Sequence, residues 1–201
     1  VTTIRGYAEL YRSGGLSNVD EHDDAMRRTE AEASRVGQLV DDLLLLAQLD
    51  QQPEIRNGAL DLSQIVSDAA HDIGVLQPSR IVEVEVDDDV IVHGDDRTLR
   101  QAVGNVITNA LIHTPVDTPI AINLERASGI ATLSVADEGP GMAERDLEHA
   151  TERFYRADRA RTRARGGTGL GLSITKTAVD VHGGSLELAR EVGVGTTVLV
   201  R

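Results

Sequence analysis

The chain contains neither cysteine nor tryptophan among its 201 residues, and aromatic residues make up only 2% of it. The lack of cysteine excludes a disulfide framework, a zinc–thiolate site and a cysteine nucleophile. The scarcity of aromatic side chains argues against a surface on which nucleic-acid bases stack. Basic residues are also few, with 20 Lys and Arg against 33 Asp and Glu, a formal net charge of −13. Because this charge repels a phosphate polymer on average, we do not expect nucleic acid as a partner.

Long apolar runs are absent as well. No stretch approaches the ~20 apolar residues needed to cross a bilayer, and the longest lies within residues 43–47. The first residues do not have the charged, apolar and cleavable pattern of a secretory leader. The sequence opens at Val1 in the middle of a helical pattern, so we expect it to be part of a longer protein.

The first fifty residues carry two helical patterns. Apolar residues recur at helical spacing in residues 4–11, and Ser13-Gly14-Gly15 ends that pattern. A second helix is predicted from about 18 to 50, with a heptad-like apolar seam and four further leucines beside it. One short helix cannot cover so wide an apolar face. This apolar face of the second helix packs either against the following domain or in a four-helix bundle made by two chains. We expect self-association through residues 1–50.

A polar segment with Pro53 and Gly58 predicts a linker at 51–60, and a second domain follows at 61–201. Asp61 and one of Asp95 or Asp96 are expected to cap helices over 61–76 and 95–113. A third helix of this domain is expected at 169–182. Alternation of apolar and polar residues predicts strands that are mostly joined as hairpins. The predicted strands cover 80–86, 90–93, 120–127, 130–137, 185–190 and 196–201. The predicted fold class is α+β, a two-layer sandwich with helices on one face of a mixed sheet.

Four motifs in this second domain carry possible chemistry. Asn105, Asn109 and His113 share one face of the predicted helix, and amide oxygens suit Mg²⁺. Asp137-Glu-Gly-Pro-Gly141 follows a strand, where a carboxylate can accept a hydrogen bond and glycines allow close approach. Each motif alone also fits an ordinary role, as a solvated helix stripe or a turn.

The other two motifs lie further along the chain. Arg153-Phe154-Tyr155-Arg156 stands in a long arginine-rich loop, a type of loop that often acts as a lid. The polar composition of this lid, residues 142–166, predicts that little holds it down without ligand. The glycine-rich run from Gly166 to Leu172 opens a helix, where backbone N–H groups bind phosphate. Taken singly, these two also fit a hydrophobic anchor and a glycine hinge.

In order and spacing, the four motifs strongly resemble the N, G1, F and G2 boxes of two-component sensor histidine kinases. The resemblance covers residues 61–201, and residues 1–50 resemble the dimerisation hairpin of that family without its phosphoacceptor. It implies the ATP-binding sandwich shared with gyrase and MutL-type ATPases, with ATP and Mg²⁺ as ligands.

The resemblance also implies roles for particular residues. Asn109 would ligate Mg²⁺, Asn105 would contact metal or phosphate, and Asp137 would read the adenine amine. His113 would lie near the phosphates, and Gly139 and Gly141 would line the base pocket. The remaining residues implied in ATP binding are Phe154, Tyr155 and Arg156 in the lid and Gly167, Thr168, Gly169, Leu170, Gly171 and Leu172 around the phosphates.

The chain departs from the family pattern at two places. Ile112 stands where the family often has a basic residue, so one phosphate contact is missing or is supplied by the arginine-rich lid. None of the six histidines lies in a His-Glu-x-x-x-Pro segment, so we expect no autophosphorylation of these residues. Position 105, by contrast, fits the kinase family and separates the chain from gyrase-like ATPases. Those enzymes have a glutamate general base there, and the amide of Asn105 is too weakly basic for that role.

The resemblance implies a protein-histidine kinase whose partner is a response regulator. It implies the cytoplasmic part of an inner-membrane sensor, joined to the membrane only through sequence upstream of Val1. The alternative is a nucleotide-binding interaction module that performs no phosphotransfer.

Overall fold

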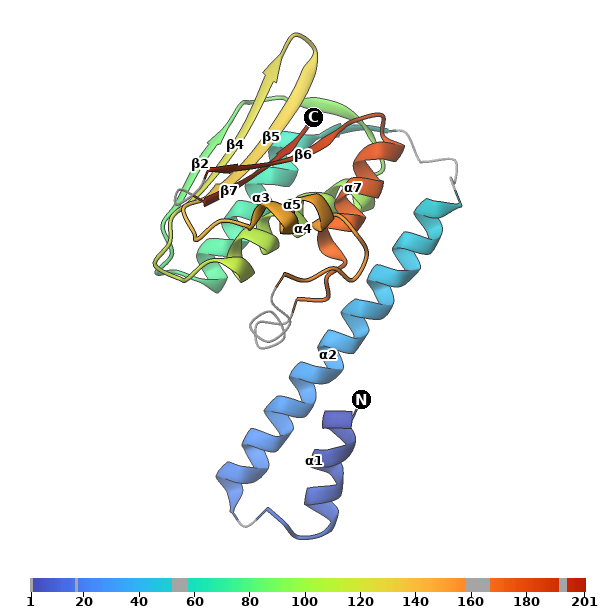
Figure 1. Ribbon diagram of the computed structural model, residues 1–201, viewed down its shortest axis with the longest axis vertical. Helices are drawn as coiled ribbons and strands as arrows, with labels where there is room; N and C mark the ends of the chain where they lie inside the picture. The colour runs from blue at the N-terminus through green and yellow to red at the C-terminus, as the bar shows by residue number, and fades with distance from the viewer. Residues whose placement is uncertain (1, 17, 52–57, 158–166, 192–194) are drawn as a thin grey trace. The chain divides into compact units, whose positions relative to one another are not determined.

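The computed structural model describes residues 2–16, 18–51, 58–157, 167–191 and 195–201. The chain divides into two compact units, Val1–Leu45 and Leu46–Arg201. The first unit contains helix α1 (Thr2–Arg12) and most of helix α2 (Val19–Asp50), whose last turns belong to the second unit (Figure 1). Among the described helices, none combines the length and the apolar character that crossing a bilayer requires.

The predicted ends of these helices have identifiable causes. Gly14 has a φ of +68°, a conformation that favours glycine, and the N–H of Gly15 returns to the carbonyl of Leu10 at 2.9 Å. The side chain of Asn18 accepts a hydrogen bond from the N–H of Glu21 at 2.9 Å, which caps the start of α2.

The second unit is built on a five-stranded sheet of order β2-β4-β5-β7-β6, with a separate β1-β3 pair. Only the β2–β4 pair of the large sheet is parallel, and β4–β5 and β6–β7 are hairpins. The strands are β1 (Gly58–Asp61), β2 (Val82–Val86), β3 (Ile91–Gly94), β4 (Ile120–Ala127), β5 (Ile130–Asp137), β6 (Leu186–Glu191) and β7 (Gly195–Val200). The helices are α3 (Leu62–Leu76), α4 (Asp96–His113), the short α5 (Glu144–His149) and α7 (Gly171–Val181).

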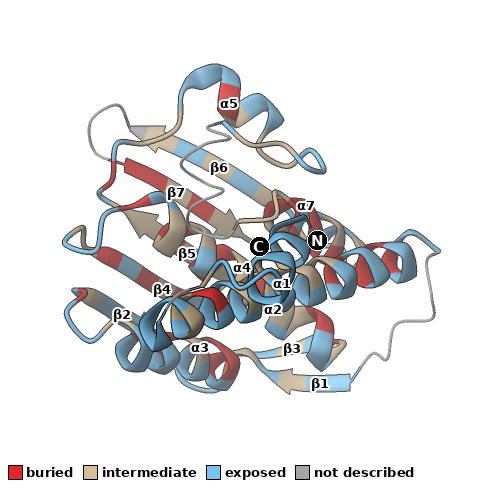
Figure 2. Ribbon diagram, turned by 90° about the horizontal axis from the view of Figure 1, so that it is seen from below, coloured by how far each residue is buried: buried red, intermediate tan, exposed pale blue. Residues whose placement is uncertain are grey.

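Helices α3, α4 and α7 cover one face of this sheet, and the core lies between the two layers (Figure 2). Alternate residues of β4, among them Ile120, Ile122 and Leu124, are almost fully buried, and they face Val66 of α3 and Val106 of α4 across the core. This two-layer architecture confirms the predicted fold class.

The sequence missed two elements because local pattern does not specify them. Gly58 begins strand β1 within the stretch expected to be linker, and its neighbours pair with β3, more than thirty residues away in sequence. The loop expected at 142–166 contains the six-residue helix α5. Residues 158–166 of that loop, like most of the expected linker, lie outside the described residues.

Candidate functional site

Four of the residues singled out in the sequence line one cavity of about 150 Å³ in the second unit: Asn109, His113, Asp137 and Gly141. It lies where the last turn of α4 meets the end of β5. The remaining lining residues are Ile112, Pro140, Met142, Ala143, Asp146, Ala157 and Thr196. A pocket for a whole drug-sized ligand has roughly 300–1,000 Å³, so this cavity has room for only one part of a nucleotide.

Asp137 is the half-buried carboxylate of this cavity. It ends strand β5, and its Oδ1 accepts the N–H of Gly139 at 2.9 Å. Burial raises the pKa of Asp137, while the N–H groups of Gly139 and Thr196 and the charges of His113 and Arg80 act in the opposite direction. When ionised, Asp137 is a hydrogen-bond acceptor with no competing donor of its own, which is the chemistry needed to bind an amine.

The glycines around Asp137 permit contacts that a side chain would prevent. A Cβ on Gly139 would lie 2.7 Å from both Asp137 Oδ1 and Thr114 Cγ2. Gly141 has a φ of +69°, and its Cβ would lie 3.0 Å from the carbonyl oxygen of Gly195. Gly195 itself packs so closely on the Asp137 backbone that no other residue fits without a shift of the strand. The close packing of the backbone around Asp137 therefore depends on these three glycines.

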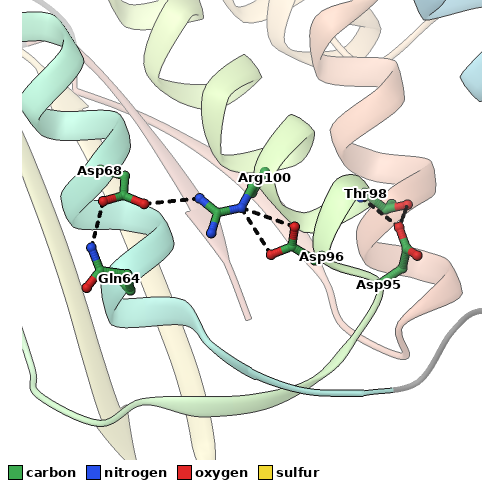
Figure 3. A network of polar contacts seen from close by, with 6 residues as sticks. All are labelled: Gln64, Asp68, Asp95, Asp96, Thr98 and Arg100. Carbon is green, nitrogen blue, oxygen red and sulfur yellow. Dashed lines mark hydrogen bonds and ion pairs between the residues drawn. The ribbon is translucent and has the colours of Figure 1, made fainter.

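Helix α4 brings its polar face to this region, as its spacing predicts. Asp95 caps the helix by accepting the N–H of Thr98 at 2.9 Å and its hydroxyl at 2.8 Å. Arg100 joins α4 to α3 through Asp68 at 3.2 Å, and it also pairs with Asp96 at 3.0 Å (Figure 3). These bonds hold the start of the helix whose last turns carry Asn109 and His113.

Asn105 lies one turn earlier on the same helix, against the start of α7. Its side-chain atoms lie 3.6–3.7 Å from where a Cβ on Gly171 would be, and its Oδ1 accepts from Gln101 at 3.4 Å. Its amide nitrogen is buried and has no hydrogen-bond partner. Buried donors are rarely left unpaired, so this amide is placed to bind an acceptor such as a phosphate oxygen.

The glycine-rich motif forms the start of α7. Gly169 has a φ of +76°, and Thr168 Oγ1 accepts the N–H of Leu170 at 3.2 Å. Leu170 precedes α7 and provides no side-chain cap for its N–H groups. The side chains of Leu170 and Leu172 are buried, so these two residues can offer a ligand only their backbone. Gly166 lies outside the described residues.

The first part of the expected lid is held by contacts around Tyr155. Its hydroxyl donates to Asp146 Oδ1 at 2.7 Å, and this bond raises the pKa of Tyr155. Phe154 is 56% exposed, has a φ of +65° and donates its N–H to the carbonyl of Gly169 at 2.9 Å. The lid and the glycine-rich motif therefore touch each other directly. Arg153, the first residue of the Arg153–Arg156 motif, pairs with Asp50 at 2.6 Å.

The structure therefore brings the four motifs into one region, although not all into one cavity. Several predicted site residues do not line the cavity described above. They are Asn105, Gly139, the three lid residues Phe154 to Arg156 and the run 167–172. Sequence reasoning missed Asp146, Gly195 and Thr196. The Gly-Thr pair that opens β7 was a visible signal, but only the sheet order brings it to Asp137.

No cluster of three or more His, Asp or Glu side chains that could hold a metal ion is found in the part of the chain that the structure describes. The two predicted Mg²⁺ ligands, Asn105 and Asn109, both lie on α4, and Asn109 lines the cavity.

Comparison with known proteins gives consistent matches. Residues 94–201 match the family described as histidine kinase-, DNA gyrase B-, and HSP90-like ATPase. Over 96% of the chain, the sequence is 35% identical to the probable sensor histidine kinase TcrY of Mycobacterium tuberculosis, of which it covers 41%. Over 98% of the chain, it is 38% identical to the sensor histidine kinase TrcS of the same organism, of which it covers 40%. The chain thus spans about two fifths of the length of these relatives.

A solved structure gives the same fold over nearly the whole chain. The histidine kinase AdeS of Acinetobacter baumannii superposes with a TM-score of 0.76 at 20% identity, over 99% of this chain and 92% of that one. The helices before the sandwich are thus part of the shared architecture.

Proposed function

Because the chain belongs to the histidine kinase-, DNA gyrase B- and HSP90-like ATPases, we propose that it is the ATP-binding core of a sensor histidine kinase. The chain is also homologous to the catalytic region of sensor histidine kinases together with the helices that precede it. The γ-phosphoryl group of ATP is transferred to a histidine that lies outside residues 1–201. From there it passes to an aspartate of a response regulator. The protein acts on the cytoplasmic side of an inner membrane.

The observation that carries this proposal is the half-buried Asp137 carboxylate in a cavity that Gly141 and Thr196 also line. It supports a base pocket in which Asp137 accepts the adenine amine, with Gly139 and Gly141 beside the ring. The cavity volume of about 150 Å³ fits a base better than a whole nucleotide. The ribose and phosphates would then extend toward Asn109, His113 and the lid.

Phosphate binding is supported by the start of α7 and by Asn105. The N–H groups of a helix N-terminus bind anions, and the unpartnered amide nitrogen of Asn105 adds a donor beside Gly171. Thr168 and the lid residues Tyr155 and Arg156 complete this set in our proposal.

The donor set also fits Mg²⁺. This ion is usually held by one or two protein oxygen ligands together with waters and substrate phosphates, and we assign the protein ligands to Asn109 and Asn105. When bound, Mg²⁺ would neutralise charge on the β- and γ-phosphates. The contribution of the chain is then to orient ATP, because an amide at position 105 cannot act as a general base for water.

A transfer experiment between two proteins tests the kinase proposal. The chain is mixed with radiolabelled Mg²⁺-ATP and a second copy that carries a His-Glu-x-x-x-Pro helix before Val1 together with Asn109→Ala and Asp137→Asn. We expect acid-labile, base-stable label on the second copy only. Nucleotide binding without any transfer would instead support the interaction module that performs no phosphotransfer.

The metal assignment has its own test. Asn109→Ala removes an oxygen ligand, so we expect the Mg²⁺-dependent part of ATP affinity, measured by titration calorimetry, to fall. Thr108→Ala is the matched control, because Thr108 is the exposed neighbour on the same helix. Equal Mg²⁺ dependence in the two variants would contradict the assignment of Asn109.

A further inference from the structure

A buried arginine that belongs to none of the four motifs lies behind the base pocket. Arg80, between α3 and β2, is only 7% exposed. Its Nη1 donates to Thr114 Oγ1 at 2.8 Å and to the carbonyl of Thr118 at 3.2 Å, and its Nε donates to Gln77 Oε1 at 2.7 Å. Burying a guanidinium costs free energy even when its donors are satisfied, so its position here calls for a reason.

A short series of contacts connects Arg80 to Asp137. Thr114, which is 2% exposed, follows His113 and donates its hydroxyl to the carbonyl of Ala110 at 2.7 Å while accepting from Arg80. The methyl group of Thr114 lies against Gly139, where a Cβ would approach it to 2.7 Å. The N–H of Gly139 in turn binds the Asp137 carboxylate. Arg80 thus fixes the side chain that supports the turn around Asp137.

The charge of Arg80 also acts on Asp137. Burial raises the pKa of Asp137, and Arg80 is one of the groups that lower it, together with His113 from α4 and the N–H groups of Gly139 and Thr196. Asp146 of α5 lines the same cavity. An ionised Asp137 can only accept a hydrogen bond, whereas a protonated one can donate. The charge state therefore matters for the choice of base, because adenine presents an amine donor where guanine presents a carbonyl acceptor.

We propose that Arg80 is a positioning residue for base recognition, which holds Thr114 and the Gly139 turn in place behind Asp137 and keeps Asp137 an acceptor, so that adenine nucleotides are selected over guanine nucleotides. The inference rests on the proposed function, since it assumes that the cavity holds a nucleotide base.

The test compares Arg80→Met, which keeps the length but removes the charge, with Arg80→Lys, which keeps the charge but loses the planar fork. Arg97→Met is the control, because Arg97 is an exposed arginine on α4. Affinities for ADP and GDP are measured by calorimetry between pH 5 and pH 8, and thermal unfolding is recorded for each variant.

In the parent, we expect ADP affinity to fall as the pH drops through the raised pKa of Asp137. In Arg80→Met this fall should begin at higher pH, and the preference for ADP over GDP at pH 6 should decrease, because Asp137 loses a nearby positive charge that favours its ionised form. Arg80→Lys should keep the parental pH profile with weaker affinity. Arg97→Met should match the parent throughout.

If Arg80→Met lowers only thermal stability and leaves the pH profile and the base preference unchanged, Arg80 has a purely structural role and the inference is wrong. Should Arg80→Met not fold, Thr114→Val provides the second variant, since it removes the hydroxyl that accepts from Arg80 and keeps the shape. An unchanged base preference in Thr114→Val would then overturn the inference. If the parent binds neither nucleotide, the proposed function fails and this inference fails with it.

Discussion

At the scale of single residues, Asp137 is held in a place that disfavours its charge. Burial raises its pKa above the ordinary value for aspartate. Between the ordinary and the raised value the folded protein binds more protons than the unfolded chain, so stability falls as pH rises through that window. At neutral pH the ionised carboxylate is therefore a cost to stability, and a ligand amine would offset it.

Asp137→Asn separates binding from stability. The amide oxygen can still accept the N–H of Gly139, while the amide nitrogen replaces the acceptor that faces the ligand. A charge-assisted hydrogen bond contributes about 1.5–3 kcal/mol, so we expect ATP affinity to fall about 10- to 150-fold and discrimination against GTP to weaken. Thermal unfolding without ligand should occur at the same or a higher temperature. Unchanged affinity by calorimetry would mean that Asp137 is only a turn residue.

The candidate-site residues that could be predicted from the sequence are those in compact motifs. Asn109 and His113 share a helix face by spacing alone, and Asp137 and Gly141 share a turn. Asp146 and Arg80 carry no such local signal, because each reaches the candidate site through tertiary packing of an element other than the motif it serves.

At the scale of elements, the capped and strongly periodic segments were predicted well. Asp61 and Asp95 cap α3 and α4, and both strands of the β4–β5 hairpin have the predicted bounds. Strand β1 was not predicted because only its pairing with β3 makes it a strand, and α5 is too short for helical periodicity to emerge.

His182 joins two elements that are distant in sequence. Its Nδ1 contacts the carbonyl of Ala178 at 2.6 Å, and its Nε2 accepts the N–H of Asp95, the capping residue of α4, at 3.1 Å. His182→Ala leaves that N–H without its acceptor, so we expect a loss of about 1–3 kcal/mol in the free energy of unfolding in urea. His71→Ala, which changes an exposed histidine of α3, should lose much less. Equal losses would mean that the bridge between α7 and α4 contributes nothing specific.

The lid gives a prediction about protection from protease. Residues 142–166 are rich in arginine, and within the described part the bond from Tyr155 to Asp146 is a main polar anchor. If the lid closes over ATP, tryptic cleavage within 142–166 should slow when Mg²⁺-ATP is present. Tyr155→Phe should cleave faster than the parent without nucleotide, since it lacks that bond. Rates that do not respond to nucleotide would argue against a lid.

At the scale of the whole molecule, the helical unit leaves apolar side chains in water. Val40, Leu43 and Leu44 are 47%, 40% and 56% exposed. Exposed apolar patches usually mark contact sites, so we expect the protein to self-associate. The double variant Leu43→Lys and Leu44→Lys should shift it toward monomer in sedimentation, whereas Asp41→Lys, which adds positive charge nearby on α2, should not. A parent that sediments as a monomer at high concentration would contradict the prediction.

The order of strands also bears on how the protein is made. Strand β7 lies between β5 and β6, although it follows both in sequence. While a ribosome is still translating, β5 keeps an open edge and β6 has no neighbour in the sheet until Gly195–Val200 has emerged. Unpaired strand edges favour association between nascent chains. Each new molecule thus passes through a vulnerable interval, and the cavity beside Asp137 is complete only when Thr196 has paired with it.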